Sequence, residues 1–403
     1  MRKEKLLRKG TERLYMRGAI ILLIVIIAVS SFYSISLLKL DNIYASTDSV
    51  TNTTSEKSIP VYMITTRGDL NFPIGESGNG YNDKYQFDDI NQLKSQCPAE
   101  IAIFVHGWGN DEFKAKERLD RVKMSLENSN YSIPLIGLSW DSNKLWDEAK
   151  IIAKEDGPKL ANFIIGYIDT CKHQHNKDTN IRLMSHSIGA RVLLSTLDDL
   201  HTNPTWNNND YKIASVHLMG AAVDDEEVSK NPLDIDGDSA IKHAHGKAIQ
   251  DEVVRFYNLY NPEDNVLQPQ PFQQDSYIYQ IYPFFENDLA LGQSGRDTTI
   301  ATRDQVSTPP YYEINVQNQI LAIRNADAME DLHYLYCGFT TCAVTLGGSY
   351  DFGLCGGFTS SYVCKVDIGD NHGGYIGFRD SNNINQLKDD GAINIVVKNW
   401  KNP

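Results

Sequence analysis

Clustered positive charge is lacking in this sequence beyond its first residues. The formal net charge is −14 at pH 7, and no basic, aromatic-rich stripe follows the N-terminus. Nucleic-acid-binding domains carry clustered Lys and Arg side chains that face phosphates. The charge balance therefore excludes nucleic acid as an expected partner.

Closely paired cysteines are also absent. None of the cysteine spacings is the C-x-x-C typical of zinc sites, and His243 and His245 are spaced so that their rings lie on different faces of a helix. The run from Asp234 to Asp238 begins like a calcium loop, but its glycine stands at position 4 rather than 6, and His245 stands where that loop needs a glutamate. We expect no metal and no organic cofactor.

The cysteines that are present favour disulfide bonds. Their number is even, which is typical of a chain that matures in an oxidising compartment. Four of them are crowded into residues 337–364, where we predict a local cluster without committing to a pairing. The six are Cys97, Cys171, Cys337, Cys342, Cys355 and Cys364.

Charge is missing altogether from Gly18 to Leu38, which is rich in Ile, Leu and Val and follows a basic segment, residues 1–17. About 20 apolar residues are enough to cross a bilayer, and basic residues before the stretch favour a cytoplasmic N-terminus. We predict an uncleaved transmembrane anchor at residues 18–38, a polar stalk at 39–59 and a folded domain at 60–403. A cleaved signal peptide and a buried soluble helix are the alternatives.

The rest of the chain alternates apolar strands with helices, and no internal repeat is visible. Apolar runs such as Ile101–Val105 and Ile181–Met184 are followed by helical patterns, the first of them with Asp111 as a plausible N-cap. This alternation predicts an α/β fold with a mostly parallel central sheet and helices on both faces. We expect an irregular insertion, about residues 267–361, before the last strand, Tyr362–Ile368. It either covers the catalytic face or is a peripheral excursion.

The most informative motif is Ser185-His-Ser187-Ile-Gly189, in which an apolar run ends in a serine flanked by small residues. A strand that turns sharply into a helix exposes such a serine beside the helix N-terminus. We predict that Ser187 is a nucleophile, with the backbone N–H of Ile188 as one oxyanion donor. The second donor is expected from His106-Gly-Trp108-Gly, where we favour the N–H of Trp108.

The order of these motifs resembles that of the α/β-hydrolase superfamily, and within it the poorly characterised serine hydrolases and lipase-like esterases. The resemblance covers about residues 60–265 and 361–400. The sequence departs from the usual pattern at Ser185, which stands where the first glycine of the motif is expected.

In this superfamily the acid follows a strand after the nucleophile, and the base lies beyond the acid. The resemblance therefore implies Asp264 as the acid, with Asp224 and Glu263 as alternatives. It implies His372 as the base, because glycines follow it, whereas His333 lies within the insertion.

The resulting hypothesis is a membrane-anchored serine esterase or lipase-like hydrolase outside the cytoplasmic membrane, with a small-molecule or lipid ester as substrate. Acyl transfer or peptide hydrolysis on the same triad, and a non-enzymatic extracellular binding domain, are the alternatives.

Overall fold

The computed structural model describes residues 58–67, 75–76, 87–235, 241–264, 266–267, 289–320, 332–337, 340–345, 349–355, 362–367, 372–380 and 383–402. For residues 75–76, 332–337, 340–345, 349–355, 362–367, 379–380 and 383–385, only the backbone is described. The predicted anchor at residues 18–38 and most of the stalk lie outside this part. No helix within the described ranges combines the length and hydropathy needed to cross a membrane.

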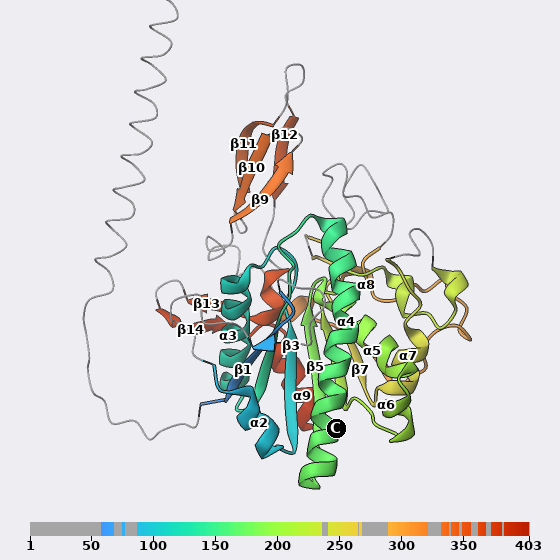
Figure 1. Ribbon diagram of the computed structural model, residues 1–403. Coiled ribbons are helices and arrows are strands. Elements are labelled where there is room, and N and C mark those ends of the chain that lie inside the picture. The colour runs from blue at the N-terminus through green and yellow to red at the C-terminus, as the bar shows by residue number, and fades with distance from the viewer. Residues whose placement is uncertain are drawn as a thin grey trace, which may run out of the picture. The chain divides into compact units, whose positions relative to one another are not determined.

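An eight-stranded sheet forms the centre of residues 58–403 (Figure 1). Its order is β2–β1–β4–β3–β5–β6–β7–β8, and every pairing is parallel except that of the short edge strand β2 with β1. This confirms the predicted mostly parallel sheet. The strands are β1 (Val61–Thr65), β2 (Gly75–Glu76), β3 (Glu100–Val105), β4 (Leu135–Ser139), β5 (Asn180–His186), β6 (Ser215–Met219), β7 (Phe256–Tyr260) and β8 (Tyr311–Asn315).

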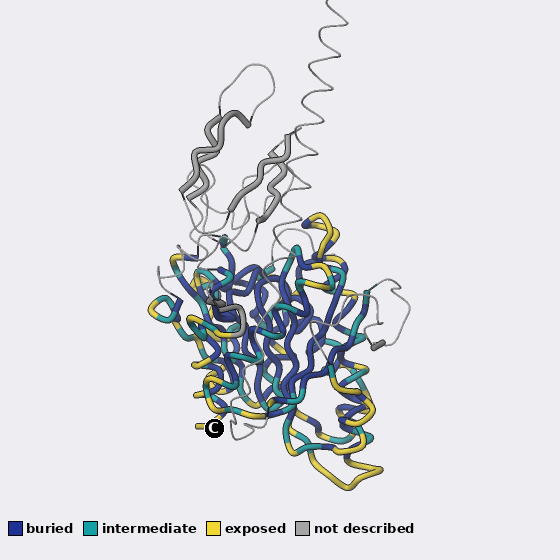
Figure 2. The backbone as a smooth tube through the Cα atoms, turned by 90° about the vertical axis from the view of Figure 1, so that its left-hand side faces the viewer, coloured by how far each residue is buried: buried dark blue, intermediate teal, exposed yellow. Residues whose placement is uncertain are grey.

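Helices cover both faces of this sheet, because its central strands are apolar on both sides. In β3, Ile101 and Ile103 pack with one layer of helices, whereas Ala102 and Phe104 pack with the other. The first layer comprises α2 (Ile90–Gln96), α4 (Trp146–Asp169), α5 (Gly189–Thr202), α6 (Pro204–Asn208) and α7 (Gly246–Glu252). The second comprises α3 (Glu112–Asn128) and α9 (Ile393–Lys401). The buried backbone is concentrated in the sheet between them (Figure 2).

Helix α3 begins where the sequence predicts. Asp111 is its N-cap, since the side chain of Asp111 accepts a hydrogen bond from the N–H of Lys114 at 2.8 Å.

Short helical segments lie between the longer helices and the strands. The remaining segments are η1 (Thr170–Gln174), η2 (Asp225–Val228), η3 (Pro232–Asp234), α8 (Leu291–Ser294), η4 (Gln317–Gln319) and η7 (Gly373–Ile376).

The boundaries predicted for the insertion are wrong in two respects. Part of residues 267–361 belongs to the central sheet, because β8 pairs in parallel with β7. The strand predicted at Tyr362–Ile368 is instead β12 (Tyr362–Asp367), which pairs with β11 (Ser349–Cys355) in a separate two-stranded sheet. As an edge strand with one exposed face, β8 (Tyr-Tyr-Glu-Ile-Asn) lacks the continuous apolar run that marks central strands.

Two further hairpin pairings complete the described strands. β9 (Leu332–Cys337) pairs with β10 (Thr340–Thr345), and β13 (Phe378–Asp380) pairs with β14 (Asn383–Asp389), both antiparallel.

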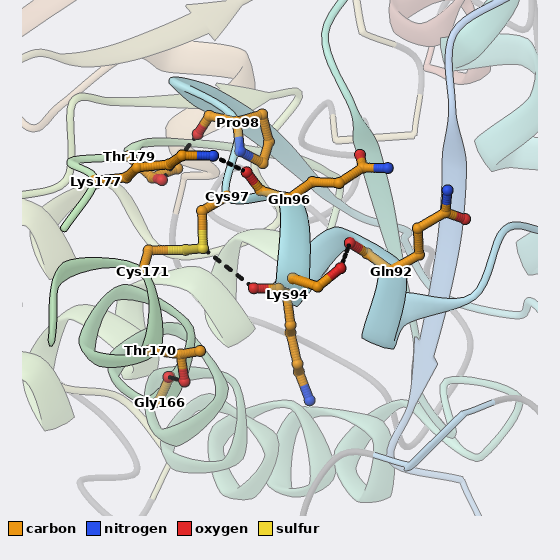
Figure 3. The surroundings of a disulfide bond; sticks show 11 residues. Gln92, Lys94, Gln96, Cys97, Pro98, Gly166, Thr170, Cys171, Lys177 and Thr179 are labelled. Atoms are coloured by element: carbon orange, nitrogen blue, oxygen red, sulfur yellow. Dashed lines mark hydrogen bonds between the residues drawn. A yellow bond between two sulfur atoms is a disulfide. The ribbon is translucent and has the colours of Figure 1, made fainter. Parts of the chain in front are cut away.

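A disulfide bond joins Cys97 to Cys171, 74 positions apart (Figure 3). It connects the C-cap of α2 to η1 at the end of α4, and Lys177 and Thr179 donate hydrogen bonds to the carbonyls of Gln96 and Pro98 beside it. Closing a loop of this length removes roughly 4 kcal/mol of unfolded-state entropy in the chain-entropy model. The predicted cysteine cluster at residues 337–364 lies outside the side chains that the structure describes.

A buried charge network anchors α5, the helix that follows the predicted nucleophile. Arg191 makes a bidentate ion pair with Glu227 at 2.7 and 2.9 Å and also donates to the carbonyl of Ile241 at 3.0 Å. His245 joins the network through Asp198 at 2.7 Å and lies 3.5 Å from Glu227. The acidic run at the start of η2, residues 224–227, therefore supplies a buried counter-ion to α5.

The network changes how two of its members titrate. Burial would raise the pKa of Glu227, but Arg191 and His245 hold it well below its ordinary value. Burial would likewise lower the pKa of His245, yet Asp198 and Glu227 raise it to about 9, from an ordinary value of 6.5. Folding therefore favours the protonated imidazole, and that contribution is complete below pH 6.5 and is lost as pH rises through about 9.

Replacing His245 is expected to weaken the pH dependence of stability. The free energy of unfolding of the wild type should fall more between pH 6 and pH 9.5 than that of His245→Gln, by on the order of 2 kcal/mol, because only the wild type loses the stabilising proton. Urea unfolding at the two pH values measures this. His243→Gln, at a half-exposed neighbouring histidine, is the control and should behave as the wild type. Equal losses in all three proteins would contradict the role of His245.

Candidate active site

The predicted site residues with described side chains lie at the carboxyl edge of the parallel sheet. Trp108 follows β3, Ser187 follows β5 and Asp264 follows β7. Parallel strands bring their carboxyl ends to one edge, where open α/β sheets bind ligands. Segments far apart in the sequence therefore meet there.

Ser187 occupies the strained turn that the sequence predicts between β5 and α5. Its φ is +56°, a left-handed conformation that a serine rarely adopts and that costs on the order of 1–3 kcal/mol. The N–H of Ser187 donates to the carbonyl of Met219 at 3.0 Å, which ties the turn to the end of β6. This backbone geometry is that of a nucleophile elbow.

Two glycines allow the elbow to pack against the loop after β3. A Cβ atom at Gly189 would lie 2.7 Å from the carbonyl oxygens of both Val105 and His106, and one at Gly107 would lie 2.8 Å from Cβ of Ser187. Side chains at these positions would push the loop and the helix apart. Ser185 lies inside β5 rather than in the turn, and it is fully buried.

The loop after β3 is held in place through His106. Its Nε2 accepts a hydrogen bond from the N–H of Trp140 at 3.2 Å, and its Nδ1 donates to the carbonyl of Gly107 at 2.9 Å. Burial and the nearby Arg67 lower the pKa of His106 to about 3, so the ring stays neutral. His106 thus orders the loop.

The expected oxyanion donors lie on either side of this contact between loop and elbow. Trp108 is in the ordered loop, with its indole donating to the carbonyl of Lys144 at 2.8 Å, and Ile188 is the N-cap residue of α5. Across the described ranges, we find no hydrogen bond that uses the backbone N–H of either residue. Both groups are therefore free to bind a developing negative charge.

Asp264 and His372 form a buried hydrogen-bonded pair. His372 Nδ1 donates to Asp264 Oδ2 at 2.7 Å, and the other carboxylate oxygen accepts from the N–H groups of Val266 and Leu267 at 3.0 and 3.1 Å. Both carboxylate oxygens are therefore engaged. His372 Nε2 is buried and has no hydrogen-bond partner among the described residues, which leaves it available for proton transfer.

The competing acids are placed differently. Asp224 is buried against Lys242, with which it forms an ion pair at 2.5 Å. Glu263 is exposed, whereas its neighbour Asp264 is fully buried. The side chain of His333, the alternative base, is outside the described residues. The triad remains a prediction, and within the described part Asp264 is the acid that contacts His372.

Sequence reasoning missed the contact between His186 and His372. His186 Nε2 donates to the backbone carbonyl of His372 at 2.8 Å, and the two ring centroids are 4.7 Å apart. Burial, together with the nearby His372, lowers the pKa of His186 well below its ordinary value. The adjacency of His186 to Ser187 was the available signal, but it could not reveal a partner 186 positions away.

The charged side chains of the described region do not form a metal centre. No three of its His, Cys, Asp or Glu side chains are grouped so that they could hold a metal ion. The chemistry that these residues offer is nucleophilic, with a strained serine, an imidazole hydrogen-bonded to a carboxylate, and two backbone donors that have no partner within the described ranges.

Comparison with known proteins agrees with this architecture. Residues 82–270 match a family described as "Alpha/beta hydrolase of unknown function (DUF900)". No curated protein matches the chain.

Among solved structures, the chain is similar to two structures of phospholipase PlaB from Legionella pneumophila. The complex with thio-NAD matches at 12% identity with a TM-score of 0.26, and the other structure matches at 12% identity with a TM-score of 0.24. Each match covers 44% of this chain and 41% or 43% of the phospholipase, so the chain spans less than half of that protein. The family match over residues 82–270 and the parallel sheet with its strand–serine–helix turn agree with the α/β-hydrolase superfamily that the sequence resembles.

Proposed function

We propose that the chain is a serine hydrolase that cleaves carboxylic esters through an acyl-enzyme on Ser187. The observation that carries this proposal is the pair formed by Asp264 and His372. A buried carboxylate accepts a hydrogen bond from one imidazole nitrogen at 2.7 Å, and the other nitrogen has no partner among the described residues. The backbone carbonyl of that histidine accepts a hydrogen bond from His186, the residue directly before the strained serine.

In the proposed acylation step, Ser187 Oγ attacks the ester carbonyl carbon and His372 Nε2 takes the serine proton. The carbonyl oxygen becomes negatively charged, and the N–H groups of Trp108 and Ile188 stabilise it. Asp264 keeps Nδ1 protonated and stabilises the imidazolium. The carbon–oxygen bond to the alcohol then breaks, and the leaving alcohol takes the proton from Nε2.

Deacylation repeats these steps with water. His372 Nε2 takes a proton from a water molecule, which attacks the acyl carbon, and the bond to Ser187 Oγ breaks as the serine regains its proton. The buried neighbours do not compete for this proton. Protonation of His106 and His186 is disfavoured by burial, and the Nε2 hydrogen of His186 already bonds to a carbonyl.

Ser187→Ala is expected to abolish covalent labelling by a fluorophosphonate probe and to lower hydrolysis of p-nitrophenyl esters by roughly 10⁴-fold or more, because it removes the hydroxyl of the strained turn. Mass spectrometry of the labelled peptide and an ester panel of graded chain length measure these effects. The control is Ser185→Ala, at a buried serine two positions earlier in β5. Labelling that survives in Ser187→Ala and disappears in Ser185→Ala would refute the assignment.

Asp264→Asn is expected to slow labelling of Ser187 by roughly 10³- to 10⁴-fold, because an amide can donate to the imidazole and so favour the wrong tautomer. The rate constant for probe incorporation at neutral pH measures the effect. Glu263→Gln is the matched control at the adjacent exposed carboxylate and should react as the wild type. The acid assignment would fail if Glu263→Gln were the slow variant.

We also propose that residues 18–38 anchor the enzyme in a membrane with its catalytic domain outside the cytoplasm. The uncharged apolar stretch and the basic residues before it support this topology. So does the disulfide between Cys97 and Cys171, since such bonds persist in oxidising compartments.

The full chain is expected to resist carbonate extraction from membranes, and a variant lacking residues 1–57 should be released. Non-reducing peptide mapping should find Cys97 linked to Cys171 in the full chain and both as free thiols in the shortened chain, which would stay in the reducing cytoplasm. Extraction of the full chain by carbonate, or free thiols in it, would argue against an outward-facing anchor.

A further inference from the structure

The ring of His186 lies where the three parts of the proposed site meet. On one side its Nε2 donates to the carbonyl of His372 at 2.8 Å. On the other side it abuts the loop after β3, because a Cβ atom at Gly107 would lie 3.3 Å from His186 Nδ1. The next residue in the chain is Ser187. One buried imidazole thus touches the loop of the oxyanion donors and the residue of the base, and its own residue directly precedes the nucleophile in the chain.

Its hydrogen-bond partner defines the tautomer of this ring. A backbone carbonyl can only accept, so the hydrogen of neutral His186 must be on Nε2. Burial and the nearby His372 lower the pKa of His186, so it remains neutral while His372 cycles through its charged form. A neutral donor at this position binds the His372 backbone without adding a second positive charge to the site.

The base needs such a contact because its single hydrogen bond to Asp264 does not fix the position of the whole ring. That bond restrains Nδ1, but the ring can still swing about it if the backbone of His372 shifts. Nε2, on the other side of the ring, would then move the most. A misplacement of about 1 Å at a reacting atom can cost about 10²-fold in rate. A second anchor at the carbonyl restrains the backbone itself.

We propose that His186 is a positioning residue that fixes the backbone of His372, so that Nε2 is held where it can take the proton of Ser187. The inference rests on the proposed hydrolase function. Asp264 orients the ring of His372 through a hydrogen bond to Nδ1, and His186 holds the backbone of His372 in place through a hydrogen bond to its carbonyl.

Two variants of similar size separate the hydrogen bond from the packing. Gln at position 186 keeps an N–H donor near the place of Nε2, and Met fills the same volume without one. The rate of fluorophosphonate labelling at Ser187 should fall by about 10- to 100-fold in His186→Met and stay within about threefold of the wild type in His186→Gln. Thermal unfolding should place both variants close together in stability. His217→Met, at a buried histidine of β6 that contacts Asn399 and Trp400, controls for loss of a buried imidazole and should label normally.

Equal labelling rates in His186→Met and the wild type would overturn the inference while leaving the hydrolase proposal intact. A slow His186→Gln variant of normal stability would do the same. A wild-type protein that does not label at Ser187 would instead refute the proposed function itself.

A measurement on the unaltered protein guards against variants that fail to fold. In ¹⁵N NMR of histidine-labelled protein at neutral pH, His186 should be the Nε2–H tautomer. An Nδ1–H tautomer would overturn the inference, because its Nε2 could not donate to His372.

Discussion

The left-handed backbone at Ser187 is the constraint on which the rest of the site depends. A residue with φ of +56° persists only where its surroundings over-determine it. Here Gly189 brings α5 against the carbonyl groups that end β3, Gly107 makes room for the serine Cβ, and Met219 accepts the hydrogen bond of the serine N–H. The strain is thus balanced by packing of β3, β5 and β6 at one edge of the sheet.

The helix after the turn needs a matching restraint. Arg191, two residues into α5 after Gly189, is buried and cannot leave Glu227 without exposing an uncompensated charge to an apolar interior. The ion pair between Arg191 and Glu227 connects the start of α5 to η2. The contact between Asp198 and His245 connects α5 to the N-terminus of α7. The position of the elbow therefore depends on charge pairing on one side and on close backbone packing on the other.

Imidazole chemistry separates the histidines of the site into different roles. His106 and His186 are buried, their pKa values are lowered, and their ring hydrogens are directed at backbone carbonyls. His372 instead faces a carboxylate that its surroundings hold in place, and its second nitrogen has no partner within the described residues. Environment, rather than residue type, distinguishes the proposed base from its neighbours.

Local patterns in the sequence determined the parallel sheet, its two helical layers, the cap at Asp111 and the serine turn, because apolar periodicity and small residues act over a few positions. Edge strand β8 escaped this reasoning because its polar face hides the apolar signal, and β12 was assigned to the wrong sheet because a strand's sequence does not name its partner. Only the tertiary structure decided that Asp264 meets His372 across 108 positions, that Cys97 pairs with Cys171, and that His186 contacts the base. Contacts of this kind depend on how the carboxyl ends of separate strands converge. A local sequence pattern does not specify which distant residues this convergence brings together.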